Sequence, residues 1–217
     1  MYITGYISDF DGETLTILAP FSDVQLLTKQ EITECEIRLD DGRTISADQR
    51  KKIYATFNDI ADWTGYTADQ LKAIMKYEYI AKTGCHYFSL SDTDMSTARD
   101  FLSFLIEFCI EHEIPCKDSL LDRSPDIARY IYFCLAKKVC AVCGKKADLH
   151  HVDTVGQGRN RKEIDHIGMR ALPLCRIHHN ECHNIGKSAF ESKYKLFGVK
   201  IDAYLAKIHK LGGRIND

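Results

Sequence analysis

Apolar residues recur at helical spacing through the middle of the chain and predict a series of helices. Ser46 and Thr67 are each followed three residues later by glutamine, the capping-box pattern that marks a helix start. Pro115 ends the third helix, because proline restricts the residue before it. Ser124 and Pro125 predict the cap and first position of the fourth. The expected helices span residues 47–63, 68–80, 94–113 and 125–138.

Short β-rich runs precede these helices, at residues 14–18 and 34–39. Residues alternate on both sides of Asp41-Gly42, which predicts a hairpin because glycine readily takes the positive φ of a tight turn. Further strands are expected in the C-terminal half, so we expect an α+β protein.

The aromatic residues of the N-terminal half allow two interpretations. Exposed rings can stack the bases of single-stranded DNA, whereas such a stripe more often forms a hydrophobic core. The residues concerned are Phe57, Trp63, Tyr77, Phe101 and Phe104.

Charge is distributed unevenly along the chain, although the net charge is only -2. Residues 135–217 carry 16 Lys and Arg against 8 Asp and Glu, whereas residues 1–134 carry 13 against 23. Seven of the nine histidines also lie in the basic half. This asymmetry predicts a C-terminal module that faces nucleic acid, joined to an acidic N-terminal module.

The amino terminus, MYITGYISDFDGE, lacks the basic and then apolar pattern of a signal peptide. No apolar stretch approaches the ~20 residues of a membrane span, so we expect a cytoplasmic protein with no membrane partner. In a reducing compartment, clustered cysteines are typical of metal sites rather than disulfides. The isolated cysteines are expected to be small buried hydrophobic residues; they are Cys35, Cys85, Cys109, Cys116 and Cys134.

Two pairs of metal-binding residues lie about 30 residues apart in the basic half. Cys140 and Cys143 form a C-x-x-C pair, and Cys175 and His178 form a C-x-x-H pair. Together they supply the four ligands of a closed tetrahedral zinc site, which stabilises a small segment rather than catalysing a reaction. Cys182 is an alternative to His178 as the fourth ligand.

Four histidines remain outside that set and indicate a second metal centre. His179 and His183 are four residues apart, so on a helix both imidazoles project from one face. His150 or His151 can supply the third ligand. Because neighbouring strand residues point to opposite sides, one is expected to face the metal and the other the scissile phosphate.

This arrangement resembles the HNH endonucleases of the ββα-metal type over about residues 138–198. The resemblance is carried by C-x-x-C, then LHH at residues 149–151, then LC-x-x-HH-x-x-x-H at residues 174–183. It implies a zinc-stapled DNA nuclease domain with a separate catalytic metal.

The resemblance assigns the catalytic metal to His150, His179 and His183, and the general base to His151. A neutral imidazole with a pKa near ~6.5 can take a proton from the attacking water at neutral pH. The expected metal is Mg²⁺ or Mn²⁺, although an all-histidine site also suits Zn²⁺ or Ni²⁺.

One position departs from the HNH pattern. Many HNH modules place an asparagine that orients the base five residues before the second zinc pair, where this chain has Arg170. His166, Asn160 or a backbone carbonyl can replace it, and the sequence does not choose among them.

A glycine-rich basic segment, GQGRNRK at residues 156–162, is predicted to form a loop between two strands. Basic loops are commonly solvated surface, but beside this motif they are expected to contact DNA phosphates. The expected DNA-binding residues are Arg159, Arg161, Lys162 and Lys187.

Two alternatives concern the whole cysteine and histidine constellation. One is a zinc-binding interaction module without an active site. The other, a zinc deaminase, is disfavoured because LHHVD and ALPLC replace the H-x-E and P-C-x-x-C of those enzymes.

The N-terminal half resembles phage recombination proteins of the lambda Orf (NinB) type over about residues 34–120. The similarity is carried by DDGRTIS, ISADQRKKIYATFNDIADWTG and FSLSDTDMSTARDFLSFLIEFCIEHEIP. It implies a DNA-binding homodimer that works with single-strand-binding protein and a RecA-type recombinase.

Together these patterns predict a mixed hairpin and helical Orf-like domain at residues 1–120 and a zinc-stapled ββα-metal HNH domain at residues 121–217. The expected function is cleavage of branched or single-stranded recombination intermediates, in the host cytoplasm if the chain is phage-encoded. The alternative is a DNA-binding mediator that loads the recombinase without cutting. Cutting at a defined sequence ranks last, because no sequence-reading element is evident.

Overall fold

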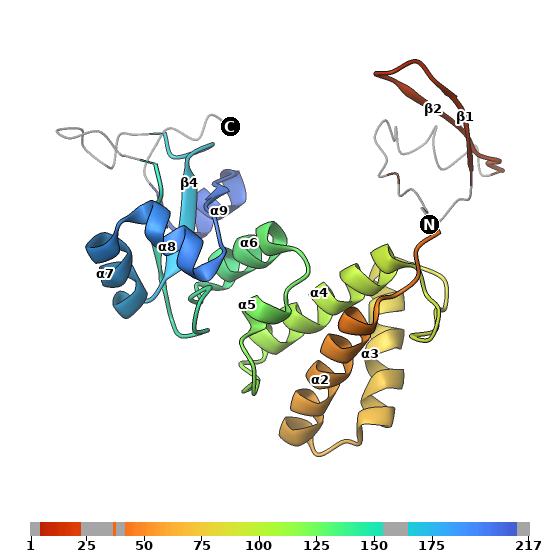
Figure 1. Cartoon of the computed structure of the whole chain (residues 1–217), viewed down its shortest axis with the longest axis horizontal. Coiled ribbons are helices and arrows are strands. Elements are labelled where there is room, and N and C mark those ends of the chain that lie inside the picture. The colour runs from red at the N-terminus through yellow and green to blue at the C-terminus, as the bar shows by residue number, and fades with distance from the viewer. Residues whose placement is uncertain (1–4, 23–36, 38–41, 154–164, 212–217) are drawn as a thin grey trace.

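A computed structural model describes residues 5–22, 37, 42–153 and 165–211. Within them the chain is α+β, as expected, with two small antiparallel sheets and several helices (Figure 1). In chain order the described elements are β1 (Tyr6–Phe10), β2 (Leu15–Leu18), α2 (Ala47–Thr64), α3 (Ala68–Thr83), α4 (Met95–Glu111), α5 (Leu120–Arg123), α6 (Ile127–Lys137), β3 (Asp148–His151), β4 (Arg170–Leu174), α7 (Arg176–Ile185), α8 (Lys187–Tyr194), β5 (Val199–Lys200) and α9 (Ala203–Ile208).

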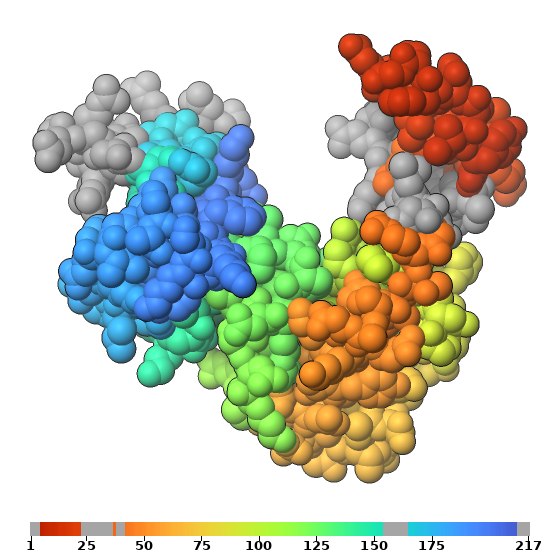
Figure 2. Space-filling model, in the orientation of Figure 1, coloured from red at the N-terminus to blue at the C-terminus, as the bar shows by residue number. Residues whose placement is uncertain are grey.

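The N-terminal hairpin pairs β1 with β2, so the strand predicted at residues 14–18 is confirmed. Gly12 in its turn has φ 102°, a left-handed value that glycine adopts without a steric penalty. The second predicted hairpin, around residues 34–42, falls largely outside the described residues. Figure 2 shows the first hairpin and the C-terminal half on opposite sides of a wide notch.

The three helices predicted before Pro115 are confirmed as α2, α3 and α4. A capping box starts α2: the Ser46 hydroxyl accepts the Gln49 N–H, and the Gln49 side chain accepts the Ser46 N–H. The second helix runs three residues further than predicted, to Thr83. The third helix ends at Glu111, four residues before Pro115 and two residues earlier than predicted.

The aromatic stripe of the N-terminal half is divided between core and surface. Phe57 and Phe101 are fully buried and Phe104 is 7% exposed, so these rings form core. Trp63 and Tyr77 are 50% and 65% exposed. The five residues therefore do not form one stacking platform, and the core interpretation holds for the three phenylalanines.

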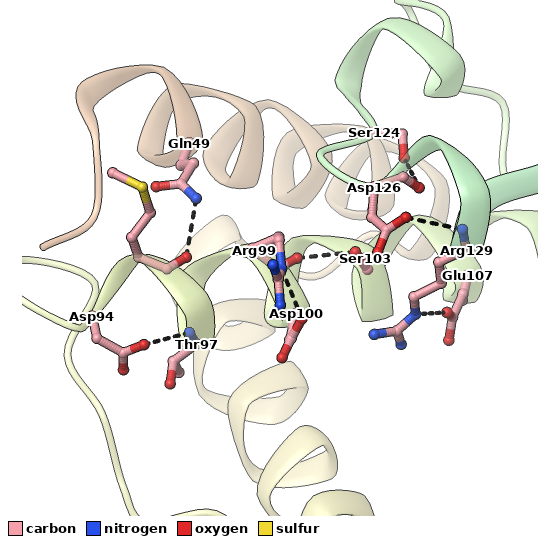
Figure 3. Close-up of polar contacts among 11 residues, drawn as sticks. Gln49, Asp94, Thr97, Arg99, Asp100, Ser103, Glu107, Ser124, Asp126 and Arg129 are labelled. Atoms are coloured by element: carbon pink, nitrogen blue, oxygen red, sulfur yellow. Dashed lines mark hydrogen bonds and ion pairs between the residues drawn. The ribbon is translucent and has the colours of Figure 1, made fainter. Parts of the chain in front are cut away.

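The start of the fourth helix corrects a prediction. Asp126, not Ser124, caps α6: its carboxylate accepts the Arg129 N–H at 3.0 Å (Figure 3). Ser124 instead ends the short helix α5, and its hydroxyl donates to the Asp126 carbonyl. Pro125 therefore precedes α6, which begins at Ile127, instead of occupying its first position.

Ion pairs join α5 and α6 to the helices that precede them. Arg129 on α6 donates to Glu107 on α4 at 2.6 Å (Figure 3). The Arg123 Nη1 atom lies 2.7 Å from the Asp59 Oδ2 atom, and both side chains are at most 4% exposed. These contacts attach the C-terminal half to the N-terminal helices.

The C-terminal sheet has the order β3-β4-β5, with His150 of β3 opposite Leu172 of β4. Helix α7 follows β4 directly, which gives the two-strand and helix arrangement expected of the ββα-metal class. The buried residues form one continuous cluster from Ile45 to Ala206. The division of the chain near residue 120 stays a prediction.

The isolated cysteines that the structure describes lie in or near the core: Cys109 and Cys134 are buried, and Cys85 and Cys116 are half-buried. Cys35 lies outside the described residues. Among the described helices, none combines the length and apolar character of a membrane crossing.

Candidate functional site

Three thiols and one imidazole meet where the turn after α6 contacts the start of α7. Cys140 and Cys143 come from the turn, Cys175 is the N-cap residue of α7, and His178 lies in its first turn. The four ligand atoms all lie within 4.8 Å of one another. The structure thus brings together the four residues of the predicted zinc site.

The separations within this thiolate cluster fit a tetrahedral zinc ion. Zinc bonds of about 2.3 Å to sulfur and about 2.0 Å to nitrogen give edges of about 3.8 Å between sulfurs and about 3.5 Å between sulfur and nitrogen. The Cys143 and Cys175 sulfurs are 3.7 Å apart. The His178 Nδ1 atom lies 3.5 Å from the Cys140 sulfur and 3.2 Å from the Cys175 sulfur.

The local electrostatics differ between the two ends of the thiolate cluster. Burial raises the pKa of Cys140 to about 12. Burial acts in the same direction on Cys175, but hydrogen bonds from the His178 backbone and side chain, together with those from Cys143 and Cys140, outweigh it and lower the pKa of Cys175 to about 7. A bound divalent cation favours the thiolate form at every such position.

A second cluster, the imidazole cluster, consists of His150 on β3 and His179 and His183 on α7. Their ligand nitrogens also lie within 4.8 Å of one another. Ring centroids are 4.7 Å apart for His150 and His179, 5.2 Å for His150 and His183, and 4.7 Å for His179 and His183. Three imidazoles that share one tetrahedral cation place their ring centres about 5 Å apart.

Burial is the main cause that lowers the pKa values of His150 and His179 in this cluster. Burial, followed by the neighbouring His179 and His183, lowers the pKa of His150 to about 4. Burial and His183 also lower the pKa of His179. Neutral imidazole is the form that binds metals, so the lowered pKa values of His150 and His179 suit these two rings to a divalent cation.

Cys182 lies beside the imidazole cluster rather than in the thiolate cluster. Its buried sulfur is 3.6 Å from the His150 Nε2 atom. It joins neither group of mutually close ligand atoms. The structure therefore places His178, and not Cys182, with Cys140, Cys143 and Cys175.

His151 points to a different partner from its neighbour His150, as expected for adjacent strand residues. Its Nε2 atom lies 2.9 Å from the Nδ1 atom of His166, which is only 4% exposed. Of the residues considered for orienting His151, His166 is thus in contact with it. Asn160 lies outside the described residues.

Arg170 occupies the position where many HNH modules have asparagine, and its side chain pairs with Asp153. The Arg170 Nη2 and Nε atoms lie 2.6 and 3.1 Å from the Asp153 Oδ1 atom. Its backbone N–H also donates to Asp153, and these hydrogen bonds lower the pKa of Asp153. The sequence reasoning did not identify this pair.

Of the predicted DNA-contacting residues, Lys187 alone lies among the described ones. It begins α8 and donates to the Val152 carbonyl at 3.2 Å, immediately after His151. Arg159, Arg161 and Lys162 lie outside the described residues.

Residues 19–212 match the sequence model of a protein family described as "Putative HNHc nuclease". The chain belongs to this HNH nuclease family. Comparison with curated proteins and with solved structures gave no match.

The extent of the HNH family match bears on both halves of the chain. It begins at residue 19 and passes through the N-terminal helices as well as both ligand clusters. The helical half is therefore part of the pattern that defines this HNH family. Nuclease activity is accordingly the general function that the family indicates.

Proposed function

We propose that the chain is a metal-dependent DNA endonuclease in which His150, His179 and His183 hold the catalytic cation. The observation that carries this proposal is the meeting of these three imidazoles, from a strand and a helix, directly beside His151. Family membership supports the class of reaction, and the basic C-terminal half suits a polyanionic substrate.

In this proposal His151 is the general base. Its imidazole takes a proton from the water whose oxygen attacks phosphorus, and the bond from phosphorus to the leaving 3′ oxygen breaks. A divalent cation at the imidazole cluster supplies electrostatic stabilisation of the charge that develops on the phosphate and the leaving oxygen. Mg²⁺ or Mn²⁺ is the proposed ion, and the three nitrogen ligands also suit Zn²⁺ or Ni²⁺.

His166 is proposed as the residue that positions His151. A hydrogen bond between two imidazoles fixes ring orientation and selects the tautomer of each. Because His166 is buried, it holds its own orientation and can transmit it to His151. It therefore takes the place that asparagine has in many HNH modules.

Cys140, Cys143, Cys175 and His178 are proposed to bind a structural Zn²⁺. All four positions are protein ligands, so the site has no open coordination position for a substrate. The zinc ion would fix the turn after α6 to the start of α7, and thus place His179 and His183 opposite His150.

The proposed substrates are branched or single-stranded recombination intermediates. This finer assignment rests on the resemblance of residues 34–120 to Orf-type recombination proteins, which also motivates a homodimer and partnership with single-strand-binding protein and a RecA-type recombinase. Residues 121–217 would then cut the DNA that residues 1–120 select.

A nuclease assay on branched, single-stranded and duplex DNA tests the proposed activity. With Mn²⁺ or Mg²⁺ the wild type should cut, and His151→Ala should lose about 10²- to 10⁴-fold in rate while still binding DNA. His209→Ala is the matched control, because His209 lies in the same half of the chain and belongs to neither ligand cluster. Intact DNA with wild type and His151→Ala alike, together with recombinase loading by both, would instead assign a mediator without nuclease activity.

A further inference from the structure

A cavity of about 820 Å³ lies beside the thiolate cluster and outside the imidazole cluster. Residues 113–120, which follow α4, form one wall. Residues 137–139 and 142–146, around the C-x-x-C turn, form the other. The cavity therefore lies where the N-terminal helices meet the zinc-binding turn.

Five lysines line this cavity, against two acidic residues. Lys117 pairs with Asp62 at 2.7 Å, and Lys137 pairs with Glu111 at 2.5 Å. The remaining three are exposed, and within the described part of the chain they form no ion pair. These three, the turn lysines, are Lys138, Lys145 and Lys146.

The acidic residues of the cavity do not neutralise the turn lysines. Asp118 contacts the Arg123 guanidinium at 3.1 Å, so its charge is already paired. Glu113 is the other acidic residue of the lining. A net positive wall thus faces a space large enough for an anionic group, although the N-terminal half as a whole is acidic.

The turn lysines are held by a short hairpin. The Ala147 N–H donates to the Lys138 carbonyl at 2.8 Å, and the Cys140 N–H donates to the Lys145 carbonyl at 2.7 Å. Val139 forms a β-bridge with Lys146. These backbone contacts enclose the proposed zinc ligands Cys140 and Cys143. The backbone of the three lysines is therefore already ordered before a ligand binds.

We infer that this cavity binds phosphate groups of the DNA strand that continues from the imidazole cluster. Lys146 precedes His150 by four residues, which an extended chain spans in about 13 Å. A strand cut beside His150 can therefore reach the turn lysines within a few nucleotides. This inference rests on the proposed function, since a DNA nuclease supplies the ligand.

The phosphate group bound in this cavity could belong to a DNA backbone or to a free phosphate compound. The charge distribution favours the backbone, because three ammonium groups spread over two sides of a hairpin match successive phosphates along one strand. Inorganic phosphate and adenosine monophosphate are the probes for the other source.

The test compares DNA affinity as a function of salt in the full-length protein with zinc bound. All proteins carry His151→Ala to prevent cutting, so the outcome does not depend on nuclease activity. The test variant adds Lys138→Gln, Lys145→Gln and Lys146→Gln. The matched control adds Lys195→Gln, Lys200→Gln and Lys207→Gln, which are exposed lysines of the same half outside the cavity lining.

The slope of log affinity against log salt is negative, and we expect it to become shallower by about 2 to 3 in the test variant, at about 0.7 to 0.9 for each lost phosphate contact. The control slope should change by less than about 0.5. Zinc content and Tm equal to the parent's would show that the test variant is folded. An unchanged salt slope in the test variant, or an equal change of slope in both triple variants, would overturn the inference. Loss of phosphate or nucleotide binding with an unchanged DNA slope would also overturn it.

If the wild type fails to cut DNA but the salt slope becomes shallower only in the test variant, the binding site stands and the proposed nuclease activity fails. If the wild type cuts and the slopes are equal, the nuclease stands and the cavity does not bind DNA. The two failures are therefore distinguishable.

Discussion

The His151 Nε2 atom lies 2.9 Å from the Nδ1 atom of His166, fifteen residues further along the chain. One member is the proposed base, and the other is buried at the start of the segment that leads into β4. Under the proposed mechanism this contact would orient His151, since Arg170 at the usual asparagine position pairs with Asp153 instead.

Replacement of His166 by leucine should lower kcat by about 10- to 100-fold, because His151 then loses the contact that fixes its ring, an effect of the size seen for residues that orient ligands. His166→Asn, which can still hydrogen bond, should recover part of the loss. Steady-state kinetics with Mn²⁺ measure this, and KM and zinc content should stay near wild type. Equal activity of the leucine variant and the wild type would exclude the positioning role.

Cys175→Ser should release the structural zinc and destabilise the C-terminal half, since zinc binding contributes directly to the folding of such small sites. Zinc content by elemental analysis and Tm by calorimetry are the measurements. Cys182→Ser is the control, and it should retain zinc because Cys182 lies outside the thiolate cluster. Loss of zinc in Cys182→Ser would instead make Cys182 a ligand, and His178→Ala would then retain zinc.

His183→Ala should weaken binding of the catalytic cation by at least about tenfold, because one of three imidazoles is lost. His183 is exposed, so the fold should tolerate the change. Calorimetric titration of Mn²⁺ into zinc-loaded protein gives the affinity. Binding as tight as in the wild type would remove His183 from the site.

Arg123→Met should lower the free energy of unfolding by about 3–5 kcal/mol, because it leaves the buried Asp59 charge unpaired. Arg170→Met breaks an exposed pair with Asp153 and should cost no more than about 1 kcal/mol. Urea denaturation compares the two variants. Similar losses in both would contradict the structural importance of the Asp59 pair.

The features that the sequence predicted well are local ones. The capping box at Ser46 and the four-residue spacing of His179 and His183 involve neighbours in the chain, so backbone geometry alone relates their side chains. The four residues of the thiolate cluster follow from ligand spacing in the same way.

The features that the sequence left open depend on tertiary contacts. The pairing of His151 with His166 requires the chain to return beside β3, and no periodic pattern encodes that return. The cap at Asp126 was missed because Ser124 and Pro125 are equally good local signals, and α5 decides between them.

The turn lysines show a signal that was present but not used. The sequence KKVCAVCGKK, at residues 137–146, carries a lysine pair on each side of the C-x-x-C motif. Its significance depends on the wall formed by residues 113–120, which only the folded chain brings opposite the turn.

The central claim is that His150, His179 and His183 share one divalent cation. Anomalous diffraction from crystals soaked in Mn²⁺, collected at the manganese and zinc absorption edges, tests it directly. The account predicts a manganese peak bonded to these three imidazoles and a separate zinc peak at the thiolate cluster. A manganese peak elsewhere, or none among the three rings at saturating Mn²⁺, would contradict it.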